Sequence, residues 1–182
     1  MKAPLLILRD KKTTTGEFRK ASNEISGILA KEVSRRLHKK EKNVVIVPIL
    51  RAGLALLPVF IDAFREARVG FIGLKRDEKT FKPKEYYKNI PKISKSDTII
   101  VLDPMLATGS SAVACIEALI KAGAREENVT FVGVISAPEG LANLQKHFPR
   151  IDTVIAVHDE KLDKHGYIVP GLGDFGDRYF GN

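Results

Sequence analysis

The sequence contains very little cysteine: Cys115 is the single one among 182 residues, so no disulfide can form within the chain. Tryptophan is absent, and the four histidines are too scattered to form a zinc-type ligand cluster. The short apolar run at the N-terminus ends at Arg9 and Asp10, and no stretch reaches the roughly 20 apolar residues that cross a bilayer. The G-x-x-x-x-G-K-[ST] pattern of nucleoside-triphosphate hydrolases is also missing. We therefore expect a protein of the reducing cytoplasm with no membrane role.

The chain is rich in charged and in hydrophobic residues. Thirty lysines and arginines against 22 acidic residues give a net charge of +8, which favours an anionic partner such as a phosphate ester, a nucleic acid or an acidic membrane surface. Hydrophobic residues make up 44% of the chain, which is enough to bury a core. We expect a single domain over residues 1–182.

Short β-branched apolar runs alternate with helix-like stretches along the chain. Strands are predicted at Val44 to Val47, Val69 to Leu74, Thr98 to Leu102, Val129 to Ile135 and Thr153 to Val157, and helices at Glu17 to His38, Gly53 to Arg65, Ser110 to Ala122 and Glu139 to His147. Fully apolar strands are typical of a parallel sheet that is buried on both faces. This alternation predicts an α/β fold with an open, mostly parallel sheet and helices on both faces.

Two segments do not follow this pattern. Lys75 to Lys95 carries eight lysines and arginines and has no clean periodicity, so we expect a lid-like loop or a β-arm there; a solvated charged excursion is the alternative. The C-terminal stretch Asp163 to Asn182 is rich in glycine, aspartate and aromatic residues and gives no helix signal.

A small, hydroxyl-rich turn follows the predicted strand that ends at Leu102. The turn and the helix start after it consist of Asp103, Pro104, Met105, Leu106, Ala107, Thr108, Gly109, Ser110 and Ser111. Backbone N–H groups and hydroxyls at a helix N-terminus suit a phosphate monoester, and a carboxylate at the strand end can accept hydrogen bonds from sugar hydroxyls. The turn therefore predicts a cradle for a ribose phosphate, unless it is an ordinary Asp turn followed by a Ser/Thr helix cap.

Two arginines follow other predicted strands. Arg51 lies between a buried strand and a helix start, next to the small residues Ala52 and Gly53, and Arg76 follows Leu74 and Lys75 in the same way. Because ligands bind at the carboxyl ends of parallel strands, we expect both guanidinium groups to converge on a diphosphate. Considered singly, an arginine at a strand end is more typical of a plain surface residue.

The segment Gly166 to Gly181 is unusually dense in glycine. Its Gly171-x-Gly173-x-x-Gly176 spacing matches a dinucleotide-binding fingerprint, but only six residues follow Gly176, too few for the helix and strand of a βαβ unit. We therefore expect a loop whose exposed peptide groups contact the edge of a flat, polar ligand. A frayed tail is the alternative.

These motifs together resemble the uracil phosphoribosyltransferase family, which belongs to the type I phosphoribosyltransferases. The resemblance extends from about Leu8 to the C-terminus and depends on Pro-Ile-Leu-Arg-Ala-Gly at 48–53, Asp-Pro-Met-Leu-Ala-Thr-Gly at 103–109 and Pro-Gly-Leu-Gly-Asp-x-Gly-Asp-Arg at 170–178. It implies transfer of ribose 5-phosphate from 5-phospho-α-D-ribose 1-diphosphate (PRPP) to N1 of uracil, giving UMP and diphosphate in pyrimidine salvage.

The resemblance also implies a role for each motif. Arg51, Arg76 and Asp103 are the expected catalytic residues, with both arginines on the diphosphate and Asp103 on the ribose hydroxyls. The rest of the turn through Ser111 would hold PRPP, with Thr108 to Ser111 on the phosphate and with Asp174 also against this substrate. Uracil would be bound largely by main-chain groups of Ile168, Gly173, Asp174 and Phe175. Mg²⁺ is expected to arrive bound to the diphosphate rather than in a site of its own.

Some features differ from the family pattern. Phe175 replaces a small residue beside the expected uracil edge, and Ser110 stands where a second glycine is usual. The chain also lacks residues that other members insert between Arg36 and Asn43 as a β-hairpin arm used in dimer contacts. We expect a homo-oligomer, a dimer or larger, without a nucleic-acid partner. Two alternatives remain: a phosphoribosyltransferase for another base, and an RNA-binding pyrimidine regulator on the same scaffold.

Overall fold

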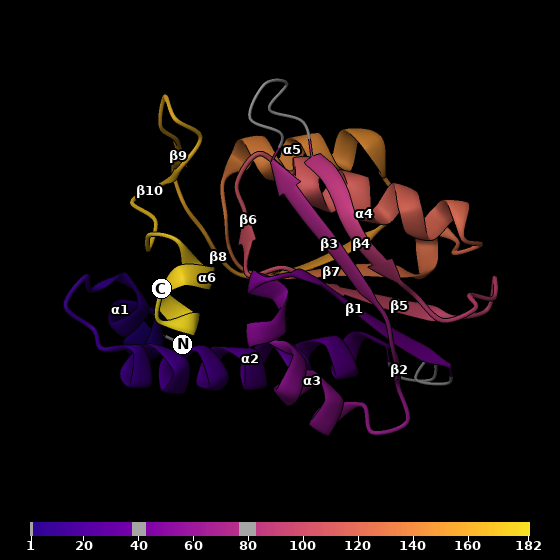
Figure 1. The fold of residues 1–182 in the computed structure, drawn as a ribbon, viewed down its shortest axis with the longest axis horizontal. Coiled ribbons are helices and arrows are strands. Elements are labelled where there is room, and N and C mark those ends of the chain that lie inside the picture. The colour runs from indigo at the N-terminus through magenta and orange to yellow at the C-terminus, as the bar shows by residue number, and fades with distance from the viewer. Residues whose placement is uncertain (1, 38–42, 77–82) are drawn as a thin grey trace.

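The structure, a computed structural model, describes residues 2–37, 43–76 and 83–182. Its centre is a sheet in which β3, β1, β5, β7 and β8 lie side by side and parallel, with β4 antiparallel at the β3 edge (Figure 1). The strands of this sheet are β1 Val44–Leu50, β2 Arg68–Val69, β3 Phe71–Arg76, β4 Pro83–Asn89, β5 Thr98–Leu102, β6 Met105–Leu106, β7 Val129–Ser136 and β8 Asp152–His158.

Helices cover both faces of the sheet, α2 and α3 on one side and α4 and α5 on the other (Figure 1). The helices are α1 Lys2–Arg9, α2 Thr15–Leu37, α3 Leu57–Ala63, α4 Ser110–Lys121, α5 Pro138–His147 and α6 Phe175–Phe180, with short 3₁₀ helices η2 Ala52–Ala55 and η3 Glu126–Asn128. A separate hairpin pairs β9 Lys161–Leu162 with β10 Ile168–Val169. The predicted α/β fold class is confirmed.

Alternating side chains of each strand build the two halves of the core. In β1, Val44 and Ile46 pack into the cluster formed with α2 and α3, whereas Val45 and Val47 pack into the cluster formed with α4. Strictly alternating directions are a property of extended backbone, so an all-apolar run is buried on both faces. This is why the short Val-Val-Ile-Val run forms a central strand rather than part of a helix.

A capping box forms at the start of α2. The Thr14 N–H donates to Glu17 Oε2 at 2.9 Å, and the Glu17 N–H donates to Thr14 Oγ1 at 3.3 Å. The helix then runs from Thr15 to Leu37. The end predicted at His38, and most of the shortened segment that follows, lie outside the described residues.

Two predictions along the chain need refinement. The single helix expected from Gly53 to Arg65 is divided into η2 and α3, and Pro58 lies in the first turn of α3, where its missing N–H is not needed. The Lys75 to Lys95 segment does supply a β-arm, because β4 pairs antiparallel with β3 from Arg76↔Pro83 to Phe71↔Asn89. Residues 77–82 of that segment lie outside the described part of the chain.

The prediction that the C-terminal segment has no helix is wrong. Asp174 caps α6, since its Oδ1 accepts a hydrogen bond from the Asp177 N–H at 2.9 Å, and Gly181 ends the helix in the left-handed conformation with φ of 83°. The N-terminal helix α1 was likewise not predicted; Pro4 lies in its first turn. Within residues 2–37, 43–76 and 83–182, no helix combines the length and the apolar character needed to span a bilayer.

Candidate active site

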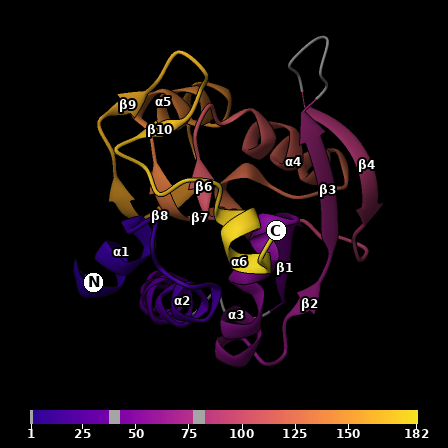
Figure 2. The same ribbon diagram turned by 60° about the vertical axis from the view of Figure 1, so that its left-hand side comes forward.

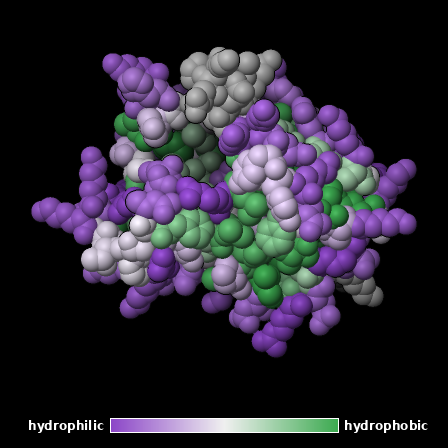
Figure 3. All heavy atoms as spheres, viewed as in Figure 1, coloured by the Kyte–Doolittle hydropathy of each residue, from purple (hydrophilic) through white to green (hydrophobic). Residues whose placement is uncertain are grey.

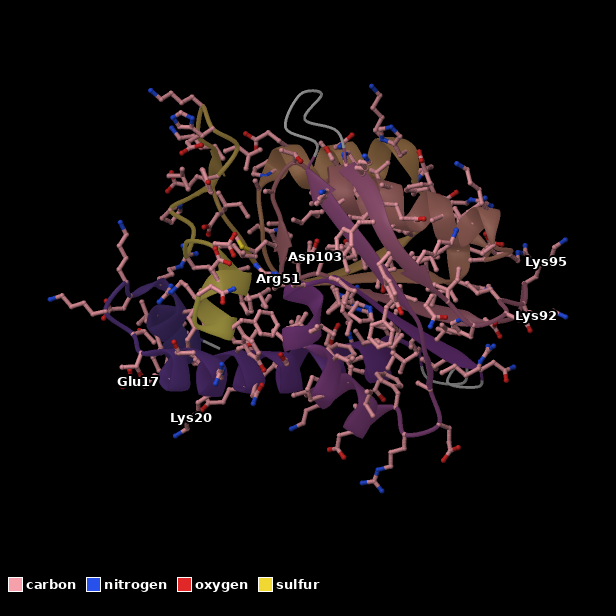
Figure 4. All side chains as sticks on the ribbon, in the orientation of Figure 1. Glu17, Lys20, Arg51, Lys92, Lys95 and Asp103 are labelled. Carbon is pink, nitrogen blue, oxygen red and sulfur yellow. The ribbon has the colours of Figure 1, made fainter. Side chains whose placement is uncertain are left out.

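Arg51 and Asp103 lie at the carboxyl ends of adjacent parallel strands. β1 and β5 pair up to Pro48↔Leu102, so the residues that follow them emerge at the same edge of the sheet (Figure 4). The turn after β1 approaches β5 closely, and a Cβ on Gly53 would lie 2.3 Å from the Leu102 carbonyl oxygen. Glycine is therefore required at position 53 to bring the Arg51 turn against the start of the Asp103 turn.

Arg76 ends β3, and β3 is parallel to β1 with Leu50 opposite Gly73. Its backbone thus lies at the edge of the sheet that also carries Arg51. The Arg76 side chain lies outside the described part of the structure. That the two guanidinium groups converge on one diphosphate remains a prediction.

The turn from Asp103 to Ser111 is held against α5. A Cβ on Gly140 would lie 2.3 Å from the Ala107 carbonyl oxygen, and Gly109 adopts φ of 77° with an imaginary Cβ only 2.6 Å from the Gly140 oxygen. The side chain of Asn143 donates from Nδ2 to the Thr108 carbonyl oxygen at 2.9 Å. We call residues 105–111 the phosphate loop, because its fixed path ends at the N-terminus of α4, where backbone N–H groups lack helical partners.

The carboxyl group of Asp103 has little contact with water. Burial raises the pKa of Asp103 to about 7, and the Met105 N–H, which donates to Oδ1 at 3.3 Å, opposes this only weakly. Near neutral pH the group can therefore carry or release a proton. When ionised it offers two acceptor oxygens to ligand hydroxyl groups.

The C-terminal segment returns to the turn that carries Arg51. Helix α6 lies beside the end of β1 (Figure 2). An imaginary Cβ on Gly176 lies 3.6 Å from the Ala52 Cβ, and Arg51 Nη2 pairs with Asp177 Oδ1 at 3.1 Å. Both side chains of this pair are at least half exposed, at 60% and 50%, so the pair contributes little and can exchange for a stronger anion. Asp177 was not singled out as a site residue, although it lies inside the Gly-Asp-x-Gly-Asp-Arg motif.

The β9–β10 hairpin closes the site on the side of the phosphate loop. An imaginary Cβ on Gly166 lies 3.8 Å from Thr108 Cγ2, and Glu139 Oε1 accepts a hydrogen bond from the Leu162 N–H at 3.0 Å. Ile168 in β10 is 5% exposed, and both Gly173 and Asp174 are exposed just beyond it. The structure thus brings together the three segments that sequence analysis placed in one site.

The side chain of Phe175 does not face this site. It is fully buried, and its ring contacts Phe18 edge to face with the centroids 5.0 Å apart. A ligand can therefore meet only the main chain at position 175. The aromatic side chain at position 175 therefore gives no structural reason to expect a base other than uracil.

The basic end of α2 is occupied by ion pairs. Arg35 donates two hydrogen bonds to Glu32, each 2.8 Å long, and Arg36 bridges Glu32 and Asp152 at the same distance. These guanidinium groups are consequently engaged with carboxylates, which gives no support to RNA binding; residues 38–42 lie outside the description. Cys115 is buried in the core, and burial raises the pKa of its thiol.

No group of three or more histidine, cysteine, aspartate or glutamate side chains in the described residues is arranged to hold a metal ion. That Mg²⁺ arrives bound to the diphosphate of the substrate therefore stays a prediction.

The chain is similar to several known proteins in sequence and in fold. The family model for uracil phosphoribosyltransferase matches residues 34–182. The uracil phosphoribosyltransferase of Limosilactobacillus fermentum is 44% identical and that of Bacillus licheniformis 45%, each alignment covering 97% of this chain and 92% of the relative. The solved structure of the AQ2163 protein from Aquifex aeolicus matches with a TM-score of 0.90 and 33% identity, over 98% of this chain and 93% of that one. The APRTase of Giardia lamblia, complexed with 9-deazaadenine, shares the fold at 19% identity and a TM-score of 0.56, over 72% of this chain and 78% of that one.

Proposed function

The chain belongs to the uracil phosphoribosyltransferase family, and from that premise we propose how its residues transfer ribose 5-phosphate from PRPP to N1 of uracil. The observation that carries the proposal is the meeting of three separate segments at one edge of the sheet. Gly53 touches the end of β5, Gly166 lies against Thr108, and Gly176 lies against Ala52. A sugar diphosphate and a base can then be held next to each other by groups that are fixed before they bind.

The reaction breaks the bond between C1 of the ribose and the diphosphate oxygen. Positive charge develops on the sugar and negative charge on the leaving diphosphate, so the site needs cationic groups at the diphosphate and fixed geometry at C1. In the proposed arrangement Arg51 leaves Asp177 and binds the diphosphate, together with Arg76. Mg²⁺ bound to the diphosphate would neutralise a further part of its charge beside these two arginines.

The phosphate loop and Asp103 hold the sugar. Main-chain N–H groups and hydroxyls of Thr108, Ser110 and Ser111 bind the 5-phosphate, and the Asp103 carboxylate accepts hydrogen bonds from the ribose hydroxyls. Asn143 supports the loop from α5 through the Thr108 carbonyl oxygen. This arrangement restrains C1 relative to the base without a covalent intermediate.

Uracil is bound mainly by the backbone. Main-chain groups of Ile168, Gly173, Asp174 and Phe175 present donors and acceptors to its alternating carbonyl and N–H groups. A base with the opposite pattern, such as cytosine, would leave buried polar groups unpaired and is rejected for that reason. Asp174 also lies against the phosphoribosyl substrate.

We propose that the reaction serves pyrimidine salvage in the cytoplasm, where the buried thiol of Cys115 stays reduced. We also propose a homo-oligomer, a dimer or larger, because apolar side chains gather on the face shown in Figure 3 and because Ile28 of α2 and Ile61 of α3 are about 40% exposed. Light scattering that gives the mass of a single chain would contradict the oligomer.

The decisive experiment measures UMP formation from PRPP and uracil in the presence of Mg²⁺. Cytosine, hypoxanthine and orotate serve as competing bases, and Arg51→Ala and Asp103→Asn as site variants. We expect turnover with uracil and none with the other bases, and a large loss in both variants. Turnover with another base but not with uracil would overturn the substrate assignment, and full activity in both variants would overturn the site.

A further inference from the structure

The loop after β10 is tied down by two side chains from distant parts of the chain. The Gly171 N–H donates to Asp159 Oδ2 at 2.7 Å, and the Gly171 carbonyl oxygen accepts from Arg9 Nη1 at 2.9 Å. Arg9 and Asp159 also bind each other through two hydrogen bonds, the one from Nη1 to Oδ2 being 3.0 Å long. The peptide groups on both sides of Gly171 are thus held by one ion pair.

This ion pair is well placed to keep the loop in a fixed position. The Asp159 side chain is 3% exposed and that of Arg9 is 20% exposed, so water competes little for their hydrogen bonds. The Asp159 N–H donates to the Ser136 carbonyl oxygen at 2.8 Å, which anchors the main chain of Asp159 to the end of β7. A planar guanidinium that binds a carboxylate and a carbonyl at once has little freedom to move.

A second arginine joins α1 to the same loop. Arg178 of α6 donates to the Leu172 carbonyl oxygen at 2.7 Å and to the Asp10 carbonyl oxygen at 2.6 Å, and it also donates to that of Leu8. Helix α1 is therefore packed against the loop by contacts at both Gly171 and Leu172. Arg9 itself lies outside residues 34–182, the part that the family model matches.

Gly171 lies between the main-chain groups that the proposed function assigns to uracil. Ile168 precedes it by three residues, and Gly173 and Asp174 follow it by two and three. Gly171 itself adopts φ of 63°, and a Cβ there would lie 2.1 Å from the Ile168 carbonyl oxygen, so the loop turns sharply at this point. A shift at Gly171 would turn the Ile168 and Gly173 groups away from a flat base.

We propose that Arg9 and Asp159 are positioning residues for uracil: their ion pair holds Gly171 and thereby orients the main-chain groups that bind the base. This inference rests on the proposed function, and it concerns the base and not the diphosphate donor. The phosphate loop is supported separately, by Gly140 and Asn143. Loss of the ion pair should consequently affect the two substrates differently.

The test compares the steady-state kinetics of wild type, Arg9→Gln, Arg9→Lys and Asp159→Asn. We expect the KM for uracil to rise about tenfold or more in Arg9→Gln and Asp159→Asn, with the KM for PRPP within about twofold of wild type. Arg9→Lys keeps the positive charge and the fold but lacks the forked guanidinium group. Its KM for uracil should therefore lie between that of wild type and that of Arg9→Gln. Arg19→Lys is the matched control, because Arg19 donates to the Tyr179 carbonyl oxygen at 2.8 Å, beyond the base loop.

Hydrogen exchange provides a readout that does not depend on activity. The Gly171 amide should exchange faster in Arg9→Gln and Asp159→Asn than in wild type or Arg19→Lys. A uracil KM that stays at the wild-type value, or a PRPP KM that rises as much as that of uracil, would overturn the inference. If instead the wild-type enzyme forms no UMP from uracil, the proposed function fails as well, so the two failures are distinguishable.

Discussion

Replacing Asp103 by asparagine should stabilise the folded protein while it lowers the activity. Burial raises the pKa of this carboxyl from its usual 3.8 to about 7. At about 1.4 kcal/mol for each pH unit, the ionised form above pH 7 is disfavoured in the folded chain by at most about 4 kcal/mol. Asp103 keeps part of its surface in contact with solvent, which reduces the effect, so we expect a gain of about 1 to 2 kcal/mol for Asp103→Asn.

The sign of the pH dependence follows from the same shift. A carboxyl whose pKa is higher in the folded than in the unfolded chain binds more protons when folded, between about pH 4 and pH 7. The stability of wild type therefore falls as the pH rises through this window and is level above it. Asparagine carries no charge in either state, so the advantage of Asp103→Asn is small near pH 4 and full near pH 8.

The assay is urea or thermal unfolding of both proteins without ligands at these two pH values. For a chain of this length, 1 to 2 kcal/mol corresponds to a melting temperature about 2 to 8 °C higher near pH 8. Asp97→Asn is the matched control: Asp97 is 2% exposed but accepts hydrogen bonds from Arg68 and from the Ser94 N–H, each 2.7 Å long. That variant should lose about 1 to 3 kcal/mol.

The outcome can refute the reasoning in two ways. If Asp103→Asn is no more stable than wild type near pH 8, burial does not disfavour the ionised Asp103. If its advantage is as large near pH 4 as near pH 8, the gain does not come from titration of this group. The loss of UMP formation in the same variant is expected to be on the order of 10- to 100-fold, because one charged acceptor for the ribose hydroxyls is removed.

The other predictions concern the support of the phosphate loop and the buried thiol. Asn143→Ala removes the 2.9 Å hydrogen bond to the Thr108 carbonyl oxygen and should raise the KM for PRPP about 5- to 10-fold, with the KM for uracil unchanged in steady-state assays. Gly140→Ala places a Cβ 2.3 Å from the Ala107 carbonyl oxygen, so it should weaken PRPP binding more than Asn143→Ala does; calorimetric titration with PRPP that shows equal affinities would contradict this. Cys115, buried and with a raised pKa, should react with a thiol reagent only on unfolding, and rapid labelling of the native protein would disprove its burial.

Local sequence patterns predicted the central strands and their order of alternation with helices. The Val44 to Val47 run is too short and too β-branched for a helix, and a strand with no polar face can only be buried on both sides. The turn from Asp103 to Ser111 could be assigned for a similar reason, because the carboxyl ends of parallel strands share one edge. These inferences depend on residues close together in the chain.

Contacts between distant residues could not be predicted in this way. Phe175 was expected beside the base, but its ring packs on Phe18, which lies far from it in sequence. The pair between Arg51 and Asp177 and the support of Thr108 by Asn143 depend equally on the tertiary fold. The helix α6 was missed because only six residues form it, although Asp174 and Gly181 do mark its ends.

Helix α5 supports both halves of the site at once. Glu139 accepts a hydrogen bond from the β9–β10 hairpin, and Asn143, four residues later, holds the phosphate loop. Four residues of an α-helix span about 6 Å, and this spacing is rigid. If α5 moves, the β9–β10 hairpin and the phosphate loop therefore move with it. The distance between the bound sugar and the bound pyrimidine then stays constant. Substitutions that displace the whole of α5 should weaken the binding of both substrates to a similar extent. Substitutions at Glu139 or at Asn143 alone should weaken the binding of only one substrate.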